Sequence, residues 1–131
     1  MSLVVVQTDL FADPLPVAIA HGCNGKGVMG AGVAKIVRRL FPACYDDYRE
    51  ICTEGCFSPG DVHHWNAGSQ HVFNLCTQKS TGPCATLDAI ESCMLTMLEM
   101  VAADPAVVSI HMPKIGCGLG GLRWQDVHPV L

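Results

Sequence analysis

The stretch that decides the fold is Gly25-Lys26-Gly27-Val28-Met29-Gly30-Ala31-Gly32, a glycine-rich loop that follows an apolar run at residues 17–20. That run does not alternate with polar residues, which is typical of a strand buried on both faces. Beyond the loop, apolar residues recur at helical spacing from Val33 to Leu40. The pattern predicts a strand-to-helix turn. Glycine backbone at a helix N-terminus can approach and hold an anion.

A second glycine loop, Gly116-Cys117-Gly118-Leu119-Gly120-Gly121, follows another apolar run at residues 107–112. We expect that run to be a buried strand as well. Two such loops indicate one ligand with linked phosphates, held from two sides by backbone N–H groups.

The rest of the chain alternates between predicted strands and helices. Further strands are expected at residues 3–7, 61–65 and 71–76, and helices at 45–51, at 87–101 and from 124 onwards. Thr86 is the expected N-cap of the longest helix, which Asp104-Pro105 ends. The alternation predicts a single α/β domain over residues 1–131 with a largely parallel sheet. Ligands bind beyond the carboxyl ends of the strands in such sheets.

Composition excludes several classes of protein. Half of the 131 residues are apolar and 15% are charged, as in a domain with one packed core. No apolar run approaches the ~20 residues of a membrane span, and the N-terminus lacks the pattern of a signal peptide. The net charge of −4, with no basic run longer than Arg38-Arg39, argues against a broad nucleic-acid surface.

Eight cysteines invite a disulfide interpretation. Free buried thiols are favoured instead by the apolar or glycine-flanked surroundings of Cys23, Cys76, Cys93 and Cys117. We therefore expect free thiols and a reducing, cytoplasmic location.

A zinc site is the alternative use of the cysteines. Its ligands would be Cys52, Cys56, His63 and His64. Their spacing matches no common zinc finger. No other pattern in the sequence calls for a metal or a cofactor, so we expect neither.

Residues 25–30 also fit G-x-G-x-x-G, the dinucleotide-binding fingerprint. That fingerprint expects an acidic residue about 20 positions further on, at the end of a second strand. Asp46 and Asp47 lie at that distance, but their surroundings are predicted to be helical. A Rossmann-type enzyme is therefore the weaker alternative.

Four segments, in order, resemble the macrodomain family of ADP-ribose-binding modules. They are Thr8-Asp9-Leu10-Phe11, His21-Gly22-Cys23-Asn24, Val28-Met29-Gly30-Ala31-Gly32-Val33-Ala34 and Met112-Pro113-Lys114-Ile115-Gly116-Cys117-Gly118-Leu119. The chain most resembles the subgroup of the terminal ADP-ribose–protein glycohydrolase and its bacterial and phage relatives. Some relatives act on ADP-ribosylated DNA bases, and others resemble ADP-ribose 1″-phosphate phosphatases. The resemblance implies a three-layer α/β/α fold with a mixed, largely parallel sheet.

The resemblance also implies how ADP-ribose, free or attached to a macromolecule, would be held. Asp9 would accept a hydrogen bond from the adenine amino group, beside the backbone N–H of Leu10. Asn24 would face the distal ribose. The diphosphate and distal ribose would be wrapped by Val28, Met29, Gly30, Ala31, Gly32 and Val33. The second loop would close over the diphosphate with Ile115, Gly116, Cys117, Gly118, Leu119 and Gly120.

For three polar residues, a structural role is the alternative to a role in binding or catalysis. Asp9 can cap its own turn, because Asp side chains commonly do so. Asn24 can serve as a turn residue that tolerates left-handed backbone geometry. His21, at the end of a buried strand, is more often a satisfied core histidine than a catalytic base.

The resemblance implies that Lys79 is catalytic, since it matches the lysine that attacks or orients C1″ of the distal ribose. A lysine amine can form a Schiff base with an opened sugar if its pKa is lowered. The alternative is a solvated loop lysine. The acidic partner of the subgroup is replaced here by Gly120, so a non-catalytic ADP-ribose reader is the alternative function. Cys117 is a conceivable nucleophile, although packing is its more common role.

The family usually continues past the position of Leu131 with a longer last helix and another strand. We therefore expect the final helix to be short and the last strand to be missing from this domain. A missing strand would leave an open sheet edge that can pair with another chain.

Overall fold

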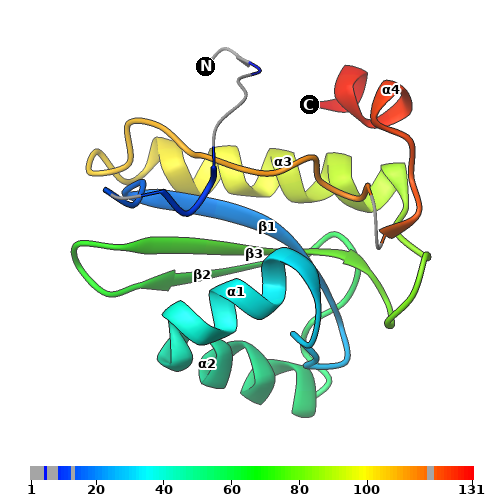
Figure 1. Ribbon diagram of the computed structural model, residues 1–131, viewed down its shortest axis with the longest axis horizontal. Coiled ribbons are helices and arrows are strands. Elements are labelled where there is room, and N and C mark those ends of the chain that lie inside the picture. The colour runs from blue at the N-terminus through cyan, green and yellow to red at the C-terminus, as the bar shows by residue number, and fades with distance from the viewer. Residues whose placement is uncertain (1–4, 6–8, 13, 118–119) are drawn as a thin grey trace.

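A mixed sheet of three strands lies at the centre of the computed structural model, which describes residues 5, 9–12, 14–117 and 120–131 (Figure 1). The elements in chain order are β1 (Ala18–Asn24), α1 (Gly32–Leu40), α2 (Pro42–Thr53), β2 (Val62–Asn66), β3 (His71–Gln78), α3 (Leu87–Ala102), α4 (Trp124–Val127) and the 3-10 turn η2 (His128–Val130). The predicted strand-to-helix turn at the first glycine loop is confirmed by β1 and α1.

The sheet order is β1-β3-β2. β1 and β3 are parallel, from the pair Ala18 and His71 to the pair Cys23 and Cys76. β2 pairs antiparallel with the other edge of β3. Because β1 and β3 run in the same direction, their carboxyl ends lie at the same edge of the sheet, where Asn24 pairs with Gln78.

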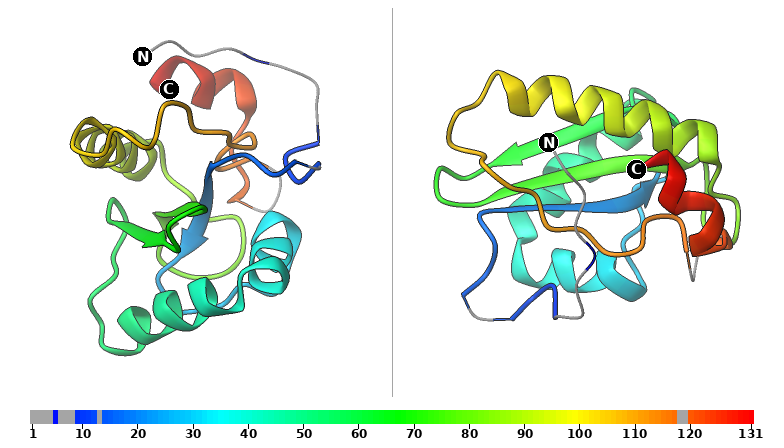
Figure 2. Two further views of the ribbon diagram at one scale, coloured as in Figure 1. Left: turned by 90° about the vertical axis from the view of Figure 1, so that its left-hand side faces the viewer. Right: turned by 90° about the horizontal axis from the view of Figure 1, so that it is seen from above.

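Helices cover both faces of the sheet, which confirms the three-layer α/β/α fold (Figure 2). On one face, Val37 of α1 and Tyr48 of α2 pack with Val72 of β3. On the other face, the apolar stripe of α3 packs against Phe73 and Leu75 of β3. Burying these two apolar layers is the main stabilising term of such a fold.

The predicted strand at residues 107–112 is wrong. The segment makes a single bridge to β1, in which the N–H of Ala20 donates to the carbonyl of His111 (3.0 Å) and the N–H of His111 donates to that of Ala18 (3.0 Å). Val108 is 84% exposed, so the apolar run is not buried as a whole. Pro105 and Pro113 bound the segment and offer no N–H for a longer ladder. The strand predicted at 3–7 lies outside the described residues, apart from Val5.

The helix ends follow from local chemistry. Thr86 caps α3 as predicted, since its hydroxyl oxygen accepts from the N–H of Ala89 (3.2 Å). α2 begins three residues earlier than predicted because Pro42, which lacks an N–H, fits the first turn. Trp124 begins a short helix, also as predicted. None of the described helices has the length and apolar character that a bilayer crossing requires.

The eight cysteines are all free thiols, which confirms that part of the prediction. Cys23, Cys44, Cys76 and Cys93 are buried in the two cores, and Cys56 and Cys84 are exposed. The buried thiols pack as small apolar side chains.

Candidate functional site

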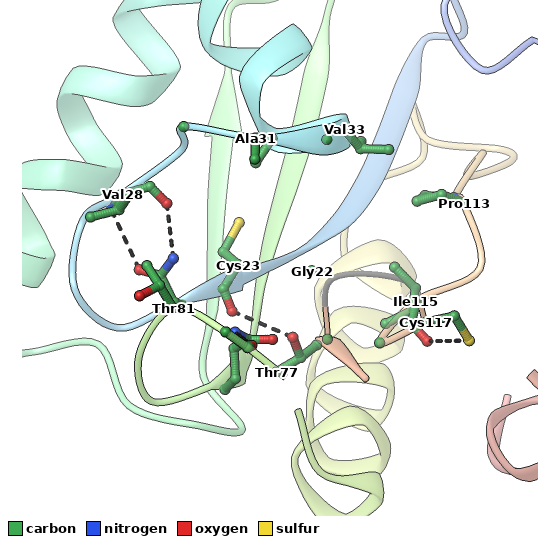
Figure 3. Close-up of a pocket in the computed structure, with 18 of the residues that line it drawn as sticks. Gly22, Cys23, Val28, Ala31, Val33, Thr77, Thr81, Pro113, Ile115 and Cys117 are labelled. Carbon is green, nitrogen blue, oxygen red and sulfur yellow. Dashed lines mark hydrogen bonds between the residues drawn. The ribbon is translucent and has the colours of Figure 1, made fainter. Parts of the chain in front are cut away.

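A cavity of about 530 Å³ opens at the carboxyl ends of β1 and β3. Figure 3 shows Val28, Ala31 and Val33 along one side of it and Ile115 and Cys117 on the other, with Gly22 and Thr77 between them. The cavity therefore lies where the sequence predicted a ligand site, between the two glycine loops.

The N-terminus of α1 forms one wall of the cavity. No side chain caps this helix end, and Gly32, Val33 and Ala34 of its first turn line the cavity. The first N–H groups of a helix have no partner within the helix and carry the positive end of its dipole. The backbone of Gly32 has φ +61°, a conformation that favours glycine and lets the chain enter the helix at this point. This wall is suited to an anion such as a diphosphate.

The carboxamide of Asn24 organises the first glycine loop. Its Nδ2 donates to the carbonyl of Val28 (2.9 Å), and its Oδ1 accepts from the N–H of Lys26 (2.9 Å). The hydroxyl of Tyr48 lies 2.7 Å from the backbone oxygen of Asn24 and 3.0 Å from Oδ1. Burial raises the pKa of Tyr48 well above its usual range, so the hydroxyl stays protonated and can donate. The left-handed turn role left open for Asn24 is wrong, since none of the described non-glycine residues has a positive φ. Asn24 instead holds the loop through its side chain, and it also lines the cavity.

The second loop is held mainly by backbone bonds. The N–H of Leu122 donates to the carbonyl of Gly116 (2.9 Å), and the N–H of Ala85 donates to that of Gly120 (3.2 Å). Gly116 has φ +77°, and a Cβ built on it would lie 2.7 Å from Cδ1 of Ile90. Only glycine fits there without a shift of its neighbours.

Most of the predicted ligand residues line the cavity. Those that do are Asn24, Val28, Gly30, Ala31, Gly32, Val33, Ile115, Gly116, Cys117 and Gly120. Met29 does not, because its side chain is buried in the core (1% exposed). Gly118 and Leu119 lie outside the described residues.

The predicted adenine contacts, Asp9 and Leu10, are not among the cavity-lining residues. The carboxylate of Asp9 accepts a hydrogen bond from the N–H of Phe11 (3.0 Å), which is the turn-capping role left open by the sequence. Their contact with a ligand stays a prediction.

Lys79 follows directly after β3 and is exposed, and it does not line the cavity. Its carbonyl accepts from the N–H of Gly25 (3.2 Å), which joins the end of β3 to the first loop. A catalytic role for its amine stays a prediction. The lysine that does line the cavity is Lys114, whose Nζ lies 5.6 Å from the centre of the Trp124 ring.

The thiols of the cavity are poor nucleophiles. Burial raises the pKa of Cys23 and that of Cys117, and the positive charge of Lys114 only partly opposes the rise at Cys117. Both groups are therefore neutral near pH 7, and the thiolate is the reactive form.

His21 is a core histidine. It is fully buried, and its Nε2 lies 2.6 Å from Oδ1 of Asn74. Burial lowers its pKa to about 4, so the ring is neutral at physiological pH.

Sequence reasoning missed the contribution of the β3 end to the site. Thr77 and Gln78 line the cavity, as do Thr81 and Gly82 of the turn that follows. The available signal was the predicted strand at 71–76, since the carboxyl ends of parallel strands share an edge of the sheet.

The structure does not support the two alternative sites, the dinucleotide-binding fingerprint and the zinc site. Asp46 and Asp47 lie within α2 rather than after a strand, so the acidic residue of the dinucleotide fingerprint has no counterpart there. Among the described residues, no group of three or more potential ligands lies close enough to hold a metal ion, and this includes Cys52, Cys56, His63 and His64.

Comparisons with known proteins agree with this geometry. The macro domain family model matches residues 20–131. A DNA ADP-ribosyl glycohydrolase of Thermus aquaticus is 30% identical over 93% of this chain, which spans 34% of that protein.

Solved structures of similar sequence share the fold, and two of them are compared with this chain by their TM-score, identity and coverage. The macrodomain of Mycobacterium tuberculosis DarG has a TM-score of 0.85 and 27% identity, covering 95% of this chain and 83% of that one. Thermosipho africanus DarTG in complex with ADP-ribose has a TM-score of 0.79 and 25% identity, covering 87% and 33%. Because the family model covers most of the chain and both glycine loops lie at one cavity, this protein is a member of the macrodomain family.

Proposed function

We propose that this macrodomain binds ADP-ribose in the cavity and hydrolyses an ADP-ribosyl linkage. The observation that carries the proposal is the uncapped N-terminus of α1, which opens into a cavity large enough for a nucleotide and faces the second glycine loop. The described wall carries one cationic side chain, Lys114, so backbone N–H groups would supply most of the attraction for the diphosphate.

The ligand would run between the two loops. The diphosphate would lie against Gly32 and Val33, with Gly116 and Cys117 opposite, and the distal ribose would face Asn24. Asp9 and Leu10 would contact the adenine, which requires their turn to approach the bound ligand. The choice of ADP-ribose as the ligand is supported by a solved relative that is a complex with ADP-ribose.

Lys79 is the proposed nucleophile. Its neutral amine would attack C1″ and displace the target group, which leaves with the proton that the amine gives up. Water would then hydrolyse the bond between lysine and C1″, which regenerates the amine and releases ADP-ribose. Its position in the chain, one residue after the cavity-lining Gln78, supports this role. The neutral thiols of Cys23 and Cys117 do not compete for it.

A non-catalytic reader is the second candidate, and one observation favours it. None of the described residues that line the cavity carries a carboxylate or an imidazole, and Gly120 stands where an acid was expected. General acid–base catalysis contributes typically 10²–10⁴-fold, about the size of the loss that a site without such a group would face.

The target that carries the ADP-ribose is the remaining part of the proposal. Relatives are named for DNA ADP-ribosyl linkages, for ADP-ribose and for ADP-ribose 1″-phosphate. The net charge of −4 argues for recognition of the ADP-ribosyl group itself rather than of a long nucleic-acid segment. We place the protein in the cytoplasm because eight free thiols suit a reducing compartment.

Titration and turnover together test the function. Isothermal titration with ADP-ribose, with NAD and AMP as controls, is expected to give micromolar affinity that prefers ADP-ribose, about −8 kcal/mol. Turnover is then measured on ADP-ribosylated DNA, ADP-ribosylated protein and ADP-ribose 1″-phosphate. Lys79→Ala is expected to lower turnover at least a hundredfold and to leave the affinity within about threefold.

Lys35→Ala is the matched control, since Lys35 is an exposed lysine of α1 that does not line the cavity. Equal turnover in Lys79→Ala, Lys35→Ala and the unmodified protein would remove Lys79 from the mechanism. Binding without turnover on all three substrates would support the reader, and no binding by a folded sample would overturn both candidates.

A further inference from the structure

Gln78 occupies a position at the site to which neither the glycine loops nor the lysine hypothesis assigns a role. It is the last residue of β3, pairs with Asn24 of β1 and lines the cavity, whereas the next residue, Lys79, is exposed and does not. With Thr77, it is therefore one of the two residues that the end of β3 places at the cavity.

The orientation of its carboxamide is fixed by the turn that follows. Nε2 donates to the carbonyl of Ser80 (2.7 Å) and to the carbonyl of Gly82 (2.8 Å). Both partners are backbone acceptors, so a flipped amide would place three oxygens against one another. The two N–H groups of the amide are thus occupied, and Oε1 is left as the acceptor.

Oε1 lies at the cavity wall. A Cβ built on Gly120, which also lines the cavity, would lie 3.4 Å from this oxygen. Among the described residues, no group donates a hydrogen bond to Oε1. A polar acceptor in such a place stabilises a ligand that brings a donor and disfavours one that brings another acceptor.

We propose that Oε1 of Gln78 accepts a hydrogen bond from a hydroxyl of the ribose that lies beyond the diphosphate. This inference rests on the proposed function, since it assigns a residue to the distal ribose of ADP-ribose. A phosphate oxygen brings no proton at neutral pH and is repelled by a fixed carbonyl oxygen, so the diphosphate remains with the N-terminus of α1. Gln78 and its strand neighbour Asn24 then face the same sugar from adjacent strands.

The test compares ADP-ribose with ADP, which lacks the distal ribose. Titration of the unmodified protein is expected to give tighter binding of ADP-ribose. Gln78→Met, which is similar in length but has no acceptor oxygen, is expected to weaken ADP-ribose about tenfold and to leave ADP within about twofold. Gln78→Asn keeps the amide, shortens its reach by one methylene and is expected to show the same selective loss, which covers the case in which Gln78→Met does not fold.

Cys84→Ala is the control for the turn. The thiol of Cys84 donates to the same Ser80 carbonyl (3.2 Å), so its removal disturbs the turn without touching Oε1. An equal loss for ADP-ribose and ADP in the Gln78 variants, or no loss for either, would overturn the inference while the proposed function stands. Failure of the unmodified protein to bind ADP-ribose would overturn both.

Discussion

The two glycine loops reach the same cavity but are built in different ways. The first loop is held by side chains, since the carboxamide of Asn24 bonds its backbone and the hydroxyl of Tyr48 donates to Asn24 in turn. The second loop is held by bonds between backbone groups, one of them from Ala85 outside the loop. It also depends on the absence of side chains where Gly116 meets Ile90 and Gly121 meets Pro83.

Because the two loops are held differently, different kinds of substitution should disrupt them. A loop organised by a buried carboxamide fails when a polar partner is removed, because the remaining polar groups lose their hydrogen bonds. A loop organised by close approach fails when a methyl group is added. Variants of opposite kinds, one that deletes atoms and one that adds them, should therefore separate the two loops.

Low pH is expected to cause the largest loss in the free energy of unfolding. The group responsible is His21 on β1, the strand that precedes the first loop. The pKa of His21 on β1 falls from 6.5 unfolded to about 4 folded, which corresponds to about 3 kcal/mol. Between pH 6.5 and 4, His21 binds a proton in the unfolded chain but not in the folded chain. The contribution of His21 to stability is therefore fully present above pH 6.5 and is lost as the pH is lowered towards 4. Denaturant unfolding at stepped pH measures this slope.

Variants of histidine identify the source of the slope. His21→Gln is expected to flatten it between pH 6.5 and 4, and His111→Gln, at an exposed histidine, is expected to leave it unchanged. An unchanged slope in His21→Gln would instead point to other titrating groups, such as His63 and His64. Burial also lowers the pKa of those two histidines.

Gly116→Ala tests the second loop by adding one methyl group. Its φ of +77° and the 2.7 Å approach to Ile90 predict a loss of about 2–3 kcal/mol in the free energy of unfolding, together with loss of ADP-ribose binding. Gly55→Ala is the matched control, with φ +72° and no atom within 4 Å of the added Cβ, so only the backbone cost of about 1 kcal/mol is expected. Equal losses in the two variants would show that the contact with Ile90 is unimportant.

Tyr48→Phe tests the first loop by removing one oxygen. The ring keeps its place in the core, and Asn24 loses the hydroxyl at 2.7 Å, so a loss of about 1–2 kcal/mol in stability is expected. ADP-ribose affinity should fall about tenfold, because the loop that borders the cavity loses its tie to α2. Tyr45→Phe removes a hydroxyl at 3.2 Å from the carbonyl of Gly27 and serves as the neighbouring control, with a smaller effect on affinity. Unchanged affinity in Tyr48→Phe would mean that Asn24 alone shapes the loop.

The sequence was sufficient for features that are encoded locally. Glycine spacing and the apolar period after it predicted the turn into α1, and Thr86 predicted the start of α3, because each signal lies within a few residues of the feature. The ordered motifs then led to the correct family, and with it to the three layers of the fold.

Features set by contacts between distant residues could not be predicted in the same way. The segment around His111 was assigned as a strand from its apolar residues, but a strand needs a ladder of partners that one bridge to β1 does not supply. Gln78 reaches the cavity only because β3 pairs in parallel with β1. The register of that pairing cannot be predicted from the sequence of either strand by itself. The tie between Asn24 and Tyr48 joins residues 24 positions apart, for which no periodic signal exists.

That tie has a consequence for the entropy of binding. The hydroxyl of Tyr48 closes the chain from Asn24 through the first loop, α1 and α2 into a ring, and α1 and α2 share Phe41 as C-cap and N-cap. Closing such a ring costs conformational entropy, and that cost is met once, during folding. The first loop is therefore already ordered when a ligand enters the cavity. Binding then loses less conformational entropy, so a larger part of the interaction free energy contributes to affinity.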